Sequence, residues 1–212
     1  MEQLDFIKQI ENSEKQELAE NEHKKFVDLM YPHFGLDNRP DYCEIIIKPM
    51  FGMGHLCKNP FRIEINNRYN LKENRNKIIH TVWHESSHYL HYLKNPYPIK
   101  EEFSDDEFQH DERIYLVEGI ADLGALLMLE KEGGLDYNQV RRYHMKIPDK
   151  RLCEEEMLVW VIAMKDPGLL KKLVKENIPK ARELMNQHRE EASIYVNSIC
   201  RKGLEIPDDS FC

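Results

Sequence analysis

The β-forming runs of this chain lie together between residues 42 and 66, and helical spacing of apolar residues dominates elsewhere. Tyr42–Lys48 is built around three consecutive isoleucines and reads as a strand. Phe61–Asn66 alternates apolar and polar residues, the pattern of a half-buried strand. The segment between these two runs contains turn-forming residues and has room for another short strand. The turn-forming residues are Pro49, Gly52, Gly54, Asn59 and Pro60. Strands grouped in one segment and helices in others predict an α+β fold with a small sheet.

Two helices are predicted after the strands. Lys72–Leu93 carries apolar residues at helical spacing and must end before Pro96, because proline cannot continue the backbone hydrogen-bond ladder. Ile114–Glu130 shows the same spacing and ends at Gly133. The acidic segment Lys100–Glu112 between them has no periodicity, so we expect a surface loop or a short helical turn there.

The chain length of 212 residues predicts a single domain with helical additions at both ends. The compact part, with the strands and the two helices, spans residues 40–132. Its expected additions are an N-terminal helical segment over 1–35, a C-terminal helical region over 135–205 and a tail over 206–212.

The charge and the apolar pattern exclude several classes of protein. A net charge of −8 has the wrong sign for a general binder of nucleic acid or anionic lipid. No run approaches the roughly 20 apolar residues of a membrane span, and Met1–Asp5 lacks the features of a signal peptide. Five scattered cysteines without a Cys-x-x-Cys pair argue against a disulfide scaffold and a zinc ribbon. We therefore expect a soluble cytoplasmic protein without nucleic-acid or membrane partners.

One pentapeptide inside the first predicted helix carries the residues of a metal site. In His84-Glu85-Ser86-Ser87-His88 the two histidines are one helical turn apart, so both imidazoles can reach one ion while Glu85 projects beside them. Apolar residues occupy the opposite arc of this helix, which predicts that the histidines face a cleft or a second helix. The alternative for the motif alone is a histidine-rich helix with solvated side chains.

The second predicted helix offers a third ligand, which a catalytic zinc site requires. Glu118 and Asp122 are one turn apart on one face, and Ala121 and Ala125 leave room for close packing. We expect Glu118 to bind the ion and Asp122 to accept the other ring N–H of His84 or His88. In an acidic protein such a pair also arises by chance.

His84-Glu85-x-x-His88 followed by Glu118-x-x-x-Asp122 resembles the gluzincin zinc metallopeptidases, and the small size resembles their compact members, the minigluzincins. The resemblance covers residues 40–132 and implies a zincin-like core of small sheet, active-site helix and glutamate helix. It implies one Zn²⁺ per chain held by His84, His88 and Glu118, with Glu85 as the general base and Asp122 supporting a ligand. It also implies that an edge strand aligns a peptide or protein substrate.

Some assignments stay open at this level. The 29 residues between His88 and Glu118 leave Glu112 as an alternative third ligand. His80 and His91 lie near the motif on the helix, and we expect them to be cleft-lining, supporting or solvated residues rather than ligands. The candidates for stabilising an oxyanion are Tyr143 and His144, with Tyr115 and His110 behind them.

The residues thus predict a zinc-dependent peptidase. The competing hypothesis is a non-catalytic, zinc-stabilised interaction protein whose C-terminal helices bind a partner. A structural zinc is closed by four protein ligands, and His80, His91 or Cys212 would be the fourth. Cys212 in the tail also suggests a latent form, in which its thiolate occupies the open position on zinc.

Overall fold

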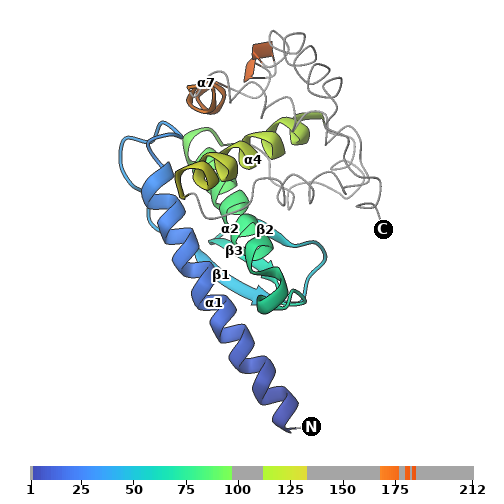
Figure 1. Cartoon of the computed structure of the whole chain (residues 1–212). Helices are drawn as coiled ribbons and strands as arrows, with labels where there is room; N and C mark the ends of the chain where they lie inside the picture. The colour runs from blue at the N-terminus through green and yellow to red at the C-terminus, as the bar shows by residue number, and fades with distance from the viewer. Residues whose placement is uncertain (1, 97–111, 133–167, 177–179, 182, 185–212) are drawn as a thin grey trace, which may run out of the picture.

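The computed structural model describes residues 2–96, 112–132, 168–176, 180, 181, 183 and 184 (Figure 1). The elements in chain order are α1 (Glu2–Met30), β1 (Glu44–Lys48), β2 (Gly54–Lys58), β3 (Phe61–Asn66), α2 (Leu71–Lys94), α4 (Glu112–Glu132) and α7 (Leu169–Lys175). The predicted α+β class is confirmed, as are the additional short strand and the helices on both sides of the sheet segment. Most of the predicted C-terminal helical region and the whole tail lie outside the described residues.

The three strands form one mixed sheet in the order β1-β3-β2. β2 and β3 form an antiparallel hairpin, in which Lys58 pairs with Phe61 across the turn at Asn59 and Pro60. Asn59 takes a φ of 95°, which asparagine tolerates better than most residues. β1 runs parallel to β3, with Ile45 opposite Ile63. β3 is therefore central, and within the described residues β2 is an edge strand.

The sheet buries one face against α2. A Cβ placed on Gly54 would meet the Thr81 methyl group of α2, so the residues that share this face of the sheet point toward the helix. Ile45, Leu56, Ile63 and Ile65 lie on this face and are 5% exposed or less. The apolar alternation seen in the sequence therefore fixes which side of the sheet carries the helix.

Local residues determine where α2 begins and ends. The Asn70 side chain accepts a hydrogen bond from the Lys72 backbone N–H at 2.8 Å, which caps the N-terminus. Asn95, immediately before Pro96, ends the helix. Nearly every residue between Ile78 and His91 is buried, on the polar arc as well as on the apolar arc. The polar arc faces α4, in agreement with the prediction that the histidines face a cleft or a second helix.

α4 packs closely across α2 (Figure 1). At the crossing, a Cβ on Gly124 would overlap Ser87 Oγ of α2 and lie 2.9 Å from Phe34 Cζ. The absence of a side chain at Gly124 therefore allows the two helix backbones to approach. Among the helices that the structure describes, none combines the length and the apolar character that crossing a membrane requires.

We predict that Gly124→Ala destabilises the fold. Alanine gains about 1 kcal/mol of helix propensity over glycine, but overpacking a filled contact typically costs about 1–3 kcal/mol. Because two groups lie within clashing distance, we expect a net loss of about 1 kcal/mol or more in the free energy of unfolding, measured by urea denaturation. Lys131→Ala, at an exposed position of the same helix, should change little. A Gly124→Ala protein as stable as wild type would contradict this packing.

Candidate metal centre

The crossing of α2 and α4 brings two histidines and a glutamate to one point. His84 Nε2 lies 3.0 Å from Glu118 Oε2 and 3.0 Å from His88 Nε2. His88 Nε2 lies 3.5 Å from Glu118 Oε1. His84 and His88 come from successive turns of α2, and Glu118 from the facing side of α4. The three residues belong to one of the groups whose donor atoms converge closely enough to hold an ion.

The spacing of these donors fits a tetrahedral metal ion. Zinc binds nitrogen and oxygen at about 2.0–2.1 Å, which places any two tetrahedral ligands about 3.3 Å apart. The observed separations of 3.0, 3.0 and 3.5 Å surround that value. Three convergent donors of zinc-binding type therefore match the size of the ion. Three protein ligands on zinc also leave a position for water or substrate.

Asp122 holds His84 in the form that binds metal. Its Oδ1 accepts a hydrogen bond from His84 Nδ1 at 2.6 Å, and the carboxyl is fully buried. With the proton on Nδ1, the lone pair of Nε2 points to the shared centre beside Glu118. Such a carboxylate fixes the ring orientation and raises its basicity as a ligand.

The electrostatics of the centre favour an anionic Glu118 beside a His84 that is cationic or bound to metal. Burial raises the pKa of Glu118, but His88 and His84 outweigh burial and hold that pKa well below its usual range. Burial lowers the pKa of His84, yet Asp122 and Glu118 together hold it well above its usual value. A cation that binds here must displace the imidazole proton, because metal-ligating histidines are neutral.

Glu85 lies beside these ligands in an enclosed position. Its side chain is buried, and burial is the main reason that its pKa is raised; Glu118 raises it further, whereas His84 and His88 partly oppose the shift. A carboxylate with a raised pKa is a better proton acceptor near neutral pH than an ordinary surface glutamate. Glu85 thus lies beside the three convergent donors, in an enclosed position that keeps its pKa above the usual value.

The neighbouring histidines of α2 are enclosed rather than solvated. His80 is 5% and His91 2% exposed, so the suggestion that either is a solvated surface residue was wrong. Burial, with a smaller effect of His88, lowers the pKa of His91 to about 3, so its ring is neutral. In the described part of the chain, neither belongs to the group formed by His84, His88 and Glu118.

A buried hydrogen-bond network, which the sequence did not indicate, joins His23 to Ser86 of the His84–His88 motif. His23 of α1 accepts a hydrogen bond from the Cys43 backbone N–H at its Nε2, at 2.9 Å. Its Nδ1–H therefore donates to Ser86 Oγ at 2.8 Å, and Ser86 in turn donates to the Val82 carbonyl. One neutral imidazole thus joins α1, the start of β1 and the residue after Glu85. In the sequence His23 is an isolated histidine among charged residues, and no local pattern marks it.

A second convergent group, His55, Cys57 and Glu64, was also missed. The only sequence signal is the spacing of two residues between His55 and Cys57 in a strand, and the pairing with Glu64 needs the hairpin register.

Several predicted residues lie outside the described part of the chain. They are Tyr143, His144, His110 and Cys212, together with the side chains of Glu112 and Tyr115. The roles suggested for them as oxyanion stabilisers, alternative ligand or latency switch stay predictions.

Comparisons of the chain with protein-family models, curated proteins and solved structures find no match. The functional argument therefore rests on the residues and their geometry.

We predict that the network at His23 makes stability depend on pH. Burial, followed by repulsion from Lys24, lowers the pKa of His23 from 6.5 to about 4. Between these values the unfolded chain binds a proton that the folded chain does not, so stability falls as pH falls. From pH 7 to pH 5 the His23 contribution is a loss of about 2 kcal/mol.

The measurement is urea denaturation of wild type and His23→Gln at both pH values. Glutamine keeps hydrogen-bonding groups but does not titrate, so the variant should lose less stability than wild type over this pH interval. Equal losses in the two proteins would show that His23 is not held neutral by burial.

Proposed function

We propose that this chain is a zinc-dependent metallopeptidase of the gluzincin type, with a zincin-like core over residues 40–132. The observation that carries the proposal is the convergence of His84 Nε2, His88 Nε2 and the Glu118 carboxylate at separations that match one tetrahedral ion. The buried Glu85 beside them and the Asp122 contact behind His84 support the same reading. Non-catalytic zinc sites do not need a base with a raised pKa.

The proposed roles follow from these positions. His84, His88 and Glu118 hold the zinc, and Asp122 keeps His84 in the required tautomer. When bound, zinc would supply Lewis acidity, polarising a peptide carbonyl and lowering the pKa of a water toward about 7. Glu85 accepts the proton of the attacking water and later delivers it to the leaving amine. Enclosure of Glu85 strengthens the electrostatic interactions within the site.

The sheet supports a peptide as the substrate. Within the described residues β2 pairs with β3 on one side only, so its other edge can offer backbone N–H and C=O groups to an extended chain. β2 also packs against α2, the helix that carries the proposed base Glu85. A peptide added to β2 would therefore pass close to the catalytic residues. A cytoplasmic location remains a prediction from the sequence.

The competing function is a non-catalytic zinc site that stabilises an interaction protein. Such a site would be closed by a fourth protein ligand. In the part of the chain that the structure describes, the convergent group contains three residues, and His80 and His91 are not among them. This arrangement favours the catalytic function.

We predict that Glu85→Gln keeps its zinc and loses turnover. Removing the base should slow peptide hydrolysis by about 10²–10⁴-fold, because the attacking water is no longer deprotonated. The measurement is a peptide-library cleavage assay combined with metal analysis of each purified protein. Glu73→Gln, at an exposed position of the same helix, is the matched control and should keep full activity. A Glu85→Gln enzyme as active as wild type would contradict the mechanism.

We predict that Asp122→Asn weakens zinc binding by about 10–100-fold. Asparagine preserves the shape of the side chain but removes the charge that supports His84 through Nδ1. Competition with a chromophoric chelator measures the affinity, and circular dichroism checks that the variant is folded. An unchanged affinity in a folded variant would show that Asp122 does not act on the metal ligand.

A further inference from the structure

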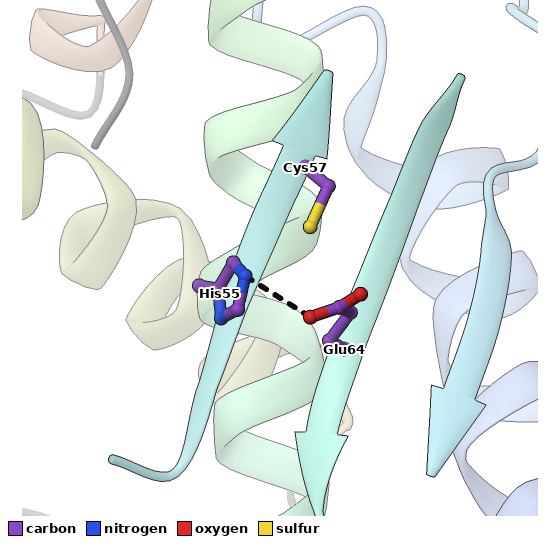
Figure 2. Close-up of side chains that lie close together, drawn as sticks. All are labelled: His55, Cys57 and Glu64. Atoms are coloured by element: carbon purple, nitrogen blue, oxygen red, sulfur yellow. Dashed lines mark ion pairs between the residues drawn. The ribbon is translucent and has the colours of Figure 1, made fainter. Parts of the chain in front are cut away.

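The hairpin of β2 and β3 carries a second cluster of metal-binding side chains, on the face of the sheet that turns away from α2 (Figure 2). His55 and Cys57 come from β2 and Glu64 from β3. His55 Nε2 lies 3.1 Å from Glu64 Oε2. One ligand atom from each of the three residues lies within 4.8 Å of the other two.

The hairpin register positions this cluster. His55 is directly opposite Glu64 in the antiparallel pair, and Cys57 is two residues further along β2 and so on the same face. The backbone hydrogen bonds of the hairpin therefore hold the three donors together, and no loop needs to become ordered when an ion binds. Cys57 and Glu64 are 1% and 2% exposed, whereas the His55 side chain is 32% exposed, so an ion can reach the cluster from the His55 side.

The donor set is that of a borderline-soft metal ion. A thiolate, an imidazole and a carboxylate are all zinc ligands, whereas Mg²⁺ and Ca²⁺ require oxygen donors. Cys57 is a thiol and not half of a disulfide. Burial raises the pKa of Glu64, but hydrogen bonds from Lys48 and Arg62 outweigh it and hold this pKa below its usual range. The carboxylate is therefore charged at neutral pH.

Two cationic side chains, Lys48 and Arg62, form ion pairs with the Glu64 carboxylate, which also contacts His55. Lys48 Nζ lies 2.6 Å from Glu64 Oε2, the oxygen that also faces His55. Arg62 Nε binds the other oxygen, Oε1, at 2.8 Å. The Lys48 side chain is 42% exposed, so it can leave Oε2 for water at little cost in free energy. A metal ion can therefore replace Lys48 on Oε2 while Arg62 keeps Glu64 in place.

We propose that His55, Cys57 and Glu64 form a second site for a divalent cation of the zinc class, which binds in exchange for the Lys48 ammonium. The site is separate from the centre at His84, His88 and Glu118 and does not depend on peptidase activity. Ion binding would tie the edge strand β2 to the central strand β3 and stabilise the hairpin by mass action.

Anaerobic titration of the full chain with Co²⁺ tests the proposal, because a thiolate bound to cobalt gives a charge-transfer absorption in the near ultraviolet. Among the described residues the centre on α2 and α4 offers no sulfur ligand, so loss of the band on substitution of Cys57 assigns it to the second site even when both sites are filled. We expect the band in wild type and its displacement by Zn²⁺, which binds such ligands more tightly than Co²⁺.

Variants of the cluster give the decisive comparison. Cys57→Ser should lose the band, whereas Cys43→Ser, at the other buried thiol of the sheet region, should keep it. His55→Gln should weaken Co²⁺ binding at least tenfold while circular dichroism shows a folded protein. Absence of the band in wild type, or an undiminished band in Cys57→Ser, would overturn the site.

The exchange with lysine has its own test. Lys48→Gln removes the competing ammonium and should tighten Co²⁺ binding by roughly threefold, the value of an exposed ion pair. Lys25→Gln, whose ion pair with Glu132 lies away from the sheet, is the matched control and should leave the affinity unchanged. Unchanged or weaker binding in Lys48→Gln would contradict the exchange.

Discussion

The close crossing of α2 and α4 is the constraint on which the candidate centre depends. Gly124 lies against Ser87, one residue before His88, so the helix backbones approach without a side chain between them. The same approach brings Glu118 and Asp122, one turn apart on α4, to opposite nitrogens of His84. A wider crossing would separate the carboxylates from the imidazoles. Helix packing and donor geometry are thus consequences of the same contact.

Much of this arrangement is encoded locally and was predictable. The isoleucines of β1 and the alternation of β3 identify the strands, and Pro96 predicts where α2 ends. The register of the hairpin and the burial of His80 and His91 were not predictable, because both depend on which element covers a face. The apolar arc of α2 predicts that its polar arc faces a cleft or a second helix, but only the fold shows that α4 covers it.

The candidate site, like the fold, combines features that were predictable from the sequence with features that were not. Helical periodicity alone places His84 beside His88 and Glu118 beside Asp122, so each pair follows from its own sequence. Their meeting is tertiary, as are the contacts of His23 with Ser86 and Cys43, which join three separate segments. The cluster on the sheet depends on pairing His55 with Glu64 through the hairpin register. Sequence periodicity therefore predicts donors within one element, whereas contacts between elements require the fold.

The central claim is that His84, His88 and Glu118 bind one zinc ion at an open site. The most direct test is a crystal structure of the zinc-loaded protein with anomalous diffraction data collected on either side of the zinc absorption edge. We predict an anomalous peak bonded to His84 Nε2, His88 Nε2 and the Glu118 carboxylate, with water as the remaining ligand. A zinc-loaded crystal without a peak at these residues would contradict the metal centre. Closure of that ion by His80 or His91 as a fourth ligand would contradict its catalytic role.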